Sequence, residues 1–135
     1  MNKRNKSVLI TGALGQDGVI LSKILLQNNY KVHGWVKNKN YNNKLTNVNY
    51  STISLLNKQK LISEIKKIKP SAIVHFGSSN PSYVERNNNE KYNAINTNSS
   101  INLINSIIES KIKCIFVFPN SSQIFSFKKI KKKID

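Results

Sequence analysis

A short apolar segment that runs directly into a glycine-rich turn constrains the fold of this chain more than any other feature. Residues 7–11 read Ser-Val-Leu-Ile-Thr, a continuous run typical of a strand buried on both faces of a sheet. Gly12, Gly15 and Gly18 follow this run. The next segment, up to residue 27, repeats apolar residues at helical spacing: Val19, Ile20, Ile24 and Leu25. A strand, a glycine turn and a helix in this order predict the opening of a βαβ unit.

The same alternation of strand-like and helical segments continues along the chain. We expect further strands at 31–36, 48–53, 72–76 and 114–118, and further helices at 58–69 and 92–110. The apolar stripe of the last helix is predicted to be Ile101, Ile104, Ile107 and Ile108. This order predicts an α/β fold, a Rossmann-type doubly wound parallel sheet of about five strands. We assign residues 1–126 to one dinucleotide-binding domain and 127–135 to a lysine-rich tail.

The charge of the chain is strongly positive but is weak support for nucleic-acid binding. The 135 residues hold 22 Lys and Arg against 6 Asp and Glu, a net charge of +16. Only Arg4 and Arg86 are arginines, whereas readers of nucleic acids favour arginine for bidentate contacts. Because Asn and Ile are also heavily used, an AT-rich coding bias explains the lysines better. We therefore expect no specific nucleic-acid partner and keep a basic nucleic-acid-binding protein as the weaker alternative.

Membrane and metal sites are not expected from the sequence. No apolar run approaches the ~20 residues of a membrane-spanning helix. The basic N-terminus is followed by too short an apolar stretch for a signal peptide, so a cytoplasmic protein is expected. Cys114 is the single cysteine, which excludes an intramolecular disulfide and a cysteine-based metal site.

The glycine spacing has the chemistry of a dinucleotide-binding turn. Gly12 permits the tight turn, Gly15 lets the backbone approach a pyrophosphate, and Gly18 allows the helix to pack on the strand. Free N–H groups and the positive end of the helix dipole then face the anion. We assign cofactor binding here to Thr11, Gly12, Gly15, Gln16, Asp17 and Gly18. An ordinary glycine-rich turn without a ligand is the competing interpretation.

The end of the second predicted strand bears on the choice of cofactor. NAD-binding domains place an acidic residue there for the ribose 2′-OH, and NADP-binding ones place a cation. Lys37 follows this strand, and residues 31–50 contain no Asp or Glu. The sequence therefore favours NADP, with NAD as the alternative and Lys37 as a cofactor-binding residue.

These segments resemble the extended short-chain dehydrogenase/reductases, the NAD-dependent epimerase/dehydratase family, and within it most closely the GDP-mannose 4,6-dehydratases. The resemblance runs from about residue 7 to 126. It rests on 11–18 with Val32-His33-Gly34, on 73–77, on 96–103 (Asn-Thr-Asn-Ser-Ser-Ile-Asn-Leu), and on 116–126. By this match Phe76 and Gly77 line the cofactor, and Ser121 takes the place of the catalytic Ser/Thr.

The resemblance implies an NADP-dependent enzyme that modifies a sugar nucleotide. In such dehydratases the sugar is oxidised at C4, loses water across C5 and C6, and is reduced at C6. A tyrosine acts as the base, assisted by the Ser/Thr hydroxyl and a nearby lysine.

Several positions depart from the family pattern. The Tyr-x-x-x-Lys motif is absent from these 135 residues, and Gln123 stands where the dehydratases have a catalytic glutamate. Ser54 replaces an acidic residue that contacts adenine. The expectation is a Rossmann domain truncated before its last strand and substrate domain, inactive by itself: a fragment, a truncated gene or half of a split enzyme.

Two further expectations follow from these departures. A non-catalytic dinucleotide-binding module is the main alternative function. We also expect a homo-oligomer, or association through the edge of the truncated sheet.

Overall fold

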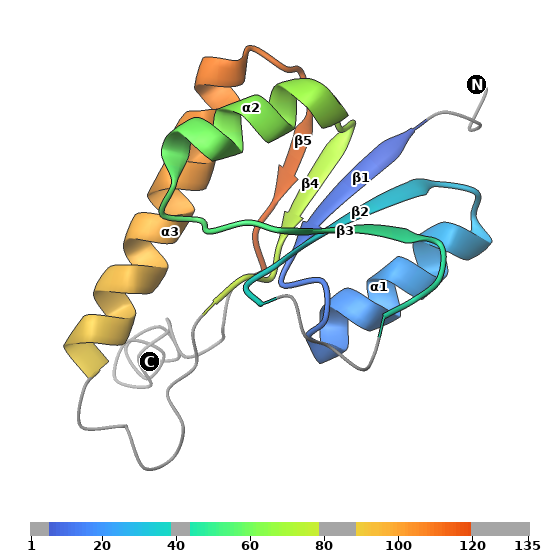
Figure 1. Ribbon diagram of the computed structural model, residues 1–135, viewed down its shortest axis with the longest axis horizontal. Helices are drawn as coiled ribbons and strands as arrows, with labels where there is room; N and C mark the ends of the chain where they lie inside the picture. The colour runs from blue at the N-terminus through green and yellow to red at the C-terminus, as the bar shows by residue number, and fades with distance from the viewer. Residues whose placement is uncertain (1–5, 39–43, 79–88, 120–135) are drawn as a thin grey trace, which may run out of the picture.

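The alternating segments of the sequence form a five-stranded parallel sheet flanked by helices (Figure 1). The computed structural model describes residues 6–38, 44–78 and 89–119. The strands in these ranges are β1 (Ser7–Thr11), β2 (Lys31–Val36), β3 (Val48–Thr52), β4 (Ala72–His75) and β5 (Ile115–Val117). The helices are α1 (Gln16–Gln27), α2 (Lys58–Ile68) and α3 (Asn89–Ser110). Every pair of neighbouring strands is parallel, which confirms the predicted fold class.

The strand order β3-β2-β1-β4-β5 places the start of the chain in the middle of the sheet. From β1 the chain moves outward through β2 and β3, and then crosses back to form β4 and β5 on the other side of β1 (Figure 1). Ligands of doubly wound sheets bind where the strand order reverses, beyond the carboxyl ends of the strands. The topology therefore directs attention to the carboxyl ends of β1 and β4.

The two faces of the sheet have separate apolar cores. Val8 and Ile10 of β1 point to the face covered by α1, where Leu21 and Leu25 pack. Leu9 points to the other face, which α2 and α3 cover (Figure 1). All of β1 is buried, as a continuous apolar run between two helical layers requires.

The buried side of α3 differs from the predicted isoleucine stripe. Ile101, Ile104 and Ile108 are exposed, whereas Ile107 is partly buried and packs against the core. Leu103 and three serines of this helix, Ser99, Ser106 and Ser110, are buried. The prediction was wrong at the three exposed positions because it ranked positions by side-chain hydrophobicity alone. Small side chains allow close approach of α3 to its neighbours, and helix hydroxyls satisfy themselves on a backbone carbonyl one turn earlier.

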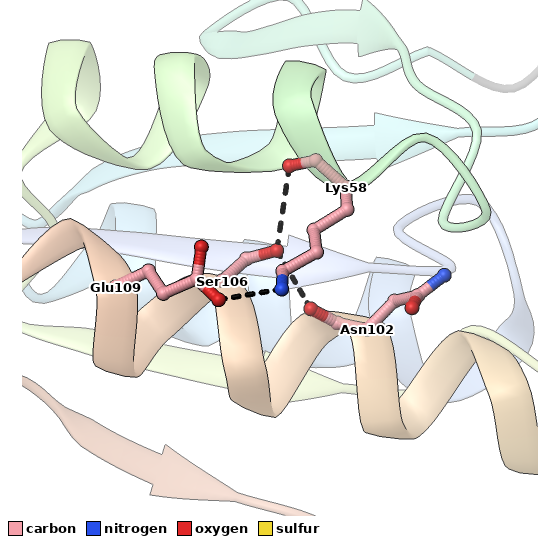
Figure 2. A network of polar contacts seen from close by, with 4 residues as sticks. All are labelled: Lys58, Asn102, Ser106 and Glu109. Carbon is pink, nitrogen blue, oxygen red and sulfur yellow. Dashed lines mark hydrogen bonds and ion pairs between the residues drawn. The ribbon is translucent and has the colours of Figure 1, made fainter.

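Polar contacts join α2 to α3 (Figure 2). The Ser106 hydroxyl donates to the Asn102 carbonyl at 2.6 Å, and its oxygen lies 3.5 Å from the Lys58 carbonyl oxygen. The Lys58 ammonium lies 2.5 Å from the Glu109 carboxylate. The Asn102 side-chain amide also donates to the carbonyls of Leu55 and Leu56, at 3.3 and 3.4 Å. These contacts tie the segment after β3 to α3.

The element boundaries agree with the sequence where apolar residues define them. The bounds of β1 and β2 are those predicted. Helix α1 begins at Gln16 rather than Val19, and α3 begins at Asn89 rather than Tyr92, because their first turns are polar and carry no apolar periodicity. Helix α2 ends before Lys69, which adopts a left-handed conformation with φ 48°. The predicted tail, residues 127–135, lies outside the described residues.

Candidate cofactor-binding site

The turn between β1 and α1 folds against the ends of β2 and β4 (Figure 1). Gly12 has φ +68°, and its N–H donates to the Trp35 carbonyl at 3.0 Å. A Cβ at Gly12 would lie 2.9 Å from backbone atoms of Phe76 and Gly77. Both the left-handed conformation and this close approach require glycine. The turn that the sequence predicts at Gly12 is therefore present.

The beginning of α1 presents its backbone without a side-chain cap. Gly15 is the N-cap residue, and no side-chain hydrogen bond caps the helix. The first N–H groups of a helix have no partner within it and lie at the positive end of the helix dipole. Asp17 is exposed in the first turn, where that dipole stabilises a carboxylate. This helix end has the properties of an anion-binding terminus.

Gly18 brings α1 into contact with the turn. A Cβ at this position would lie 2.5 Å from the Gly12 carbonyl oxygen and 2.8 Å from the Ala13 Cα. The space is closed by backbone, which cannot move aside as the end of a side chain does. The role predicted for the last glycine, close packing of helix on strand, matches this geometry.

A cavity of about 320 Å³ opens beside Gly12, at the reversal of strand order. Its walls come from the carboxyl ends of β1, β2 and β4, from the segment after β3, and from α3. The lining residues are Thr11, Gly12, Trp35, Val36, Lys37, Ile53, Ser54, Leu55, Leu56, Gly77, Ser78, Asn96 and Ser99. The cavity is mostly apolar with a few polar groups, as small-molecule sites commonly are.

A chain of hydrogen bonds lies behind this wall. The Thr11 hydroxyl oxygen accepts from the Gly77 N–H at 3.0 Å and lies 2.6 Å from Nδ1 of His75. Nε2 of His75 lies 3.1 Å from the Ser100 hydroxyl, which donates to the Asn96 carbonyl at 3.0 Å. Burial lowers the pKa of His75 below its ordinary value. His75 is thus a buried strand residue with a hydrogen-bonding partner at each ring nitrogen.

Some of the predicted cofactor residues line the cavity, and the others lie in the adjoining glycine turn, at the start of α1 or in the core behind the cavity. Phe76 packs in the core on the α1 side, and its N–H donates to the Thr11 carbonyl at 3.1 Å. Those that line the cavity are Thr11, Gly12, Lys37 and Gly77, whereas Gly15, Gln16, Asp17 and Gly18 form the adjoining turn and helix start. Ser121, the predicted catalytic residue, lies outside the described residues.

Several lining residues were not among the predicted site residues. Asn96 and Ser99 come from α3. Both belong to the segment 96–103 that supports the family resemblance, and that resemblance could have identified them as site residues. Trp35 was missed because an apolar strand residue carries no separate signal of a site. Its indole Nε1–H is buried without a hydrogen-bond partner among the described residues.

The chemistry of the walls fits an adenine dinucleotide. The cavity offers apolar surface, a lysine at its rim and a glycine turn that leads to an uncapped helix N-terminus. None of the lining residues is acidic. In the described ranges, 6–38, 44–78 and 89–119, no three His, Cys, Asp or Glu side chains gather to hold a metal, and no helix is long and apolar enough to cross a membrane.

Comparisons with known proteins identify relatives of this chain. The sequence profile described as the NAD dependent epimerase/dehydratase family matches residues 8–133. GDP-mannose 4,6 dehydratase 2 of Caenorhabditis elegans is 32% identical over 91 residues, which are 56% of this chain and 24% of that protein. This chain therefore spans about a quarter of the length of that relative.

Solved structures share the fold. The L-threonine dehydrogenase of Clostridium difficile superposes with a TM-score of 0.73 at 26% identity, covering 86% of this chain and 36% of that one. The UDP-glucose 4-epimerase of Brucella ovis, solved in complex with NAD, superposes with a TM-score of 0.74 at 18% identity, covering 84% and 35%. This chain thus corresponds to little more than a third of each.

Proposed function

Because this chain belongs to the NAD dependent epimerase/dehydratase family, we propose that it is the NADP-binding part of a sugar-nucleotide dehydratase of the GDP-mannose 4,6-dehydratase type. The observation that carries the proposal is the cavity at the reversal of strand order, which adjoins the glycine turn. A nicotinamide dinucleotide supplies hydride transfer when bound. The residues of this chain would bind and orient it.

The proposed binding mode follows from the local geometry. The pyrophosphate would lie against the backbone at Gly12 and Gly15, where the dipole of α1 favours negative charge. The adenosine end would enter the cavity past Trp35 and Lys37. Thr11 and Gly77 would form the wall on the side of β4.

Binding of NADP by the purified chain tests this proposal directly. Trp35 is the single tryptophan and lines the cavity, so energy transfer to the reduced nicotinamide of NADPH reports binding without a label. Calorimetric titration with NADP and NAD gives the two affinities. Binding of neither cofactor to a chain with the circular dichroism of an α/β protein would contradict the proposal.

Lys37 is the residue that we propose to select NADP. It is exposed at the cavity rim, one residue beyond the end of β2, where a 2′-phosphate would be in reach. We expect Lys37→Ala to weaken NADP binding about tenfold, the size of one charge-assisted contact, and to leave NAD binding unchanged. Lys66→Ala, which removes an exposed lysine of α2 outside the cavity, is the charge-matched control. Equal losses in both variants would indicate general electrostatics instead.

We propose that residues 1–135 do not turn over a sugar nucleotide by themselves. The base that the family uses would come from a Tyr-x-x-x-Lys motif, and none occurs in this sequence. The Gln123 amide cannot accept a proton as a glutamate does. A non-catalytic dinucleotide-binding module is the second candidate, and Gln123 favours it. Adding the sugar-binding part of a family member separates the two, because only a chain that serves as the cofactor-binding part of an enzyme would then support dehydration of GDP-mannose.

Among the described residues β5 is the edge strand beyond β4, and we expect this edge to promote self-association. Ile115, Val117 and Phe118 are 68%, 44% and 51% exposed on or beside this edge. Exposed apolar residues on an unpaired strand favour pairing with another chain. We predict dimers or larger species in sedimentation velocity at micromolar concentration. Val117→Lys should shift the distribution toward monomer, and a monomeric unmodified chain would refute this prediction.

A further inference from the structure

His75 lies behind the cavity wall and connects three elements there. It is the last residue of β4, and its side chain is 2% exposed. Its ring contacts Thr11 at the end of β1 and Ser100 on α3, at 2.6 and 3.1 Å. Hydrogen bonds connect Thr11 to Gly77 and Ser100 to Asn96, and Thr11, Gly77 and Asn96 all line the cavity.

The hydroxyl of Ser100 lies between two groups, the Asn96 carbonyl at 3.0 Å and Nε2 of His75 at 3.1 Å. The carbonyl can only accept, and a serine hydroxyl has one hydrogen. With that hydrogen on the carbonyl, the Ser100 oxygen accepts at Nε2, and Nε2 carries the imidazole hydrogen. A neutral imidazole has one N–H, which leaves Nδ1 as the acceptor for the Thr11 hydroxyl.

The surroundings of the ring favour this neutral form. Phe116 and Phe118 lie with ring centroids 6.4 and 5.2 Å from that of His75. In the part of the chain that the structure describes, the groups placed against the ring from β1, α3 and β5 are hydroxyls and phenyl rings, none of them charged. Burial is the cause of the lowered pKa.

We propose that His75, as the neutral Nε2–H tautomer, is a positioning residue of the dinucleotide cavity. It accepts the Thr11 hydrogen, which turns the Thr11 oxygen toward the Gly77 N–H and fixes that wall. The proposal rests on the proposed cofactor binding for its functional consequence, but the hydrogen-bond chain itself is a property of the free protein.

Proton uptake would reverse the polarity of one bond in the chain. A hydrogen on Nδ1 makes the imidazolium a donor toward Thr11, whose oxygen must then accept both it and the Gly77 N–H. The Thr11 hydrogen loses its acceptor. The wall at Gly77 is therefore expected to shift as His75 is protonated, and affinity for the dinucleotide to fall in acid.

Histidine NMR on the free protein tests the first part. The chain has two histidines, so His33→Gln leaves His75 as the only imidazole. We expect long-range nitrogen spectra to show the Nε2–H tautomer, and the Gly77 amide resonance to move as His75 titrates, with the pKa of His75 below its ordinary value because the ring is buried. An Nδ1–H tautomer, or a Gly77 amide that does not follow this midpoint, would overturn the proposal.

Two substitutions separate positioning from general packing. Asparagine at position 75 offers an acceptor to Thr11 but does not titrate, so His75→Asn should leave the Gly77 amide resonance unchanged over the pH range in which His75 titrates in the parent chain. Ser100→Ala removes the acceptor of the Nε2–H and should weaken the tautomer preference. Ser106→Ala is the matched control, because Ser106 makes the same bond to the carbonyl one turn earlier on α3. A pH-dependent shift of the Gly77 amide resonance that persists in His75→Asn would count against the proposal. Equal effects of Ser100→Ala and Ser106→Ala on the tautomer preference of His75 would also count against it.

Cofactor affinity as a function of pH tests the second part. The 2′-phosphate of NADP itself titrates near pH 6, so the comparison is between the parent chain and His75→Asn. We expect an additional loss of about three- to tenfold in the parent as His75 is protonated, the value of one hydrogen bond. Identical profiles would overturn the positioning role. Absence of binding at any pH, with Gly77 still following His75, would overturn the proposed function and leave the hydrogen-bond chain supported.

Discussion

Replacing Gly15 with valine is expected to abolish NADP binding and leave the chain folded. Gly15 is exposed, and its φ of −67° and ψ of 164° are open to any residue. An added Cβ meets one atom at 3.2 Å, the Gly12 carbonyl oxygen. The cost in folding free energy is therefore small, about 1 kcal/mol for a poor N-cap residue.

The effect on binding is large because the valine methyl groups would occupy the approach to the uncapped helix N-terminus. Loss of the pyrophosphate contacts is expected to weaken NADP at least about a hundredfold. The measurement is energy transfer from Trp35 to NADPH, with circular dichroism to verify the fold. Gly15→Ala serves as the graded control and should bind with intermediate affinity. Undiminished binding by a folded Gly15→Val chain would show that the dinucleotide does not use this turn.

Replacing Gly18 with valine is expected to destabilise the whole fold rather than binding alone. The added Cβ would lie 2.5 Å from the Gly12 carbonyl oxygen and 2.8 Å from the Ala13 Cα. Helix α1 would have to separate from the end of β1, which loosens the core on that face of the sheet. We expect the free energy of unfolding to fall by about 3 kcal/mol, as overpacking at a closed backbone contact does.

Urea unfolding followed by circular dichroism measures this loss. Lys23→Ala, at an exposed position of the same helix, is the control and should leave the midpoint nearly unchanged. Alanine is a better helix former than glycine by about 1 kcal/mol. Gly18→Ala therefore tests whether the cost of the close backbone contact exceeds this gain in helix propensity. A midpoint raised by Gly18→Ala would mean that the contact relaxes without cost.

The sequence by itself determined the sheet and the turn. The apolar run at 7–11 could satisfy its burial only as a central strand, and it became β1 with its predicted bounds. Gly12 and Gly18 were recognisable because a left-handed turn and a backbone contact exclude every other side chain. The positive φ of Gly12 and the contact of Gly18 with Gly12 and Ala13 are local constraints, since they act within one turn of the chain.

The tertiary structure alone decided which side chains meet at the site. Three isoleucines of α3 (Ile101, Ile104 and Ile108) proved to be exposed and three of its serines (Ser99, Ser106 and Ser110) buried, because packing against α2 and the sheet selected small side chains. His75 reaches Thr11 across 64 positions of sequence and Ser100 across 25. Helical periodicity and motif spacing describe one element at a time, whereas these contacts exist only after the parallel strands and α3 have come together.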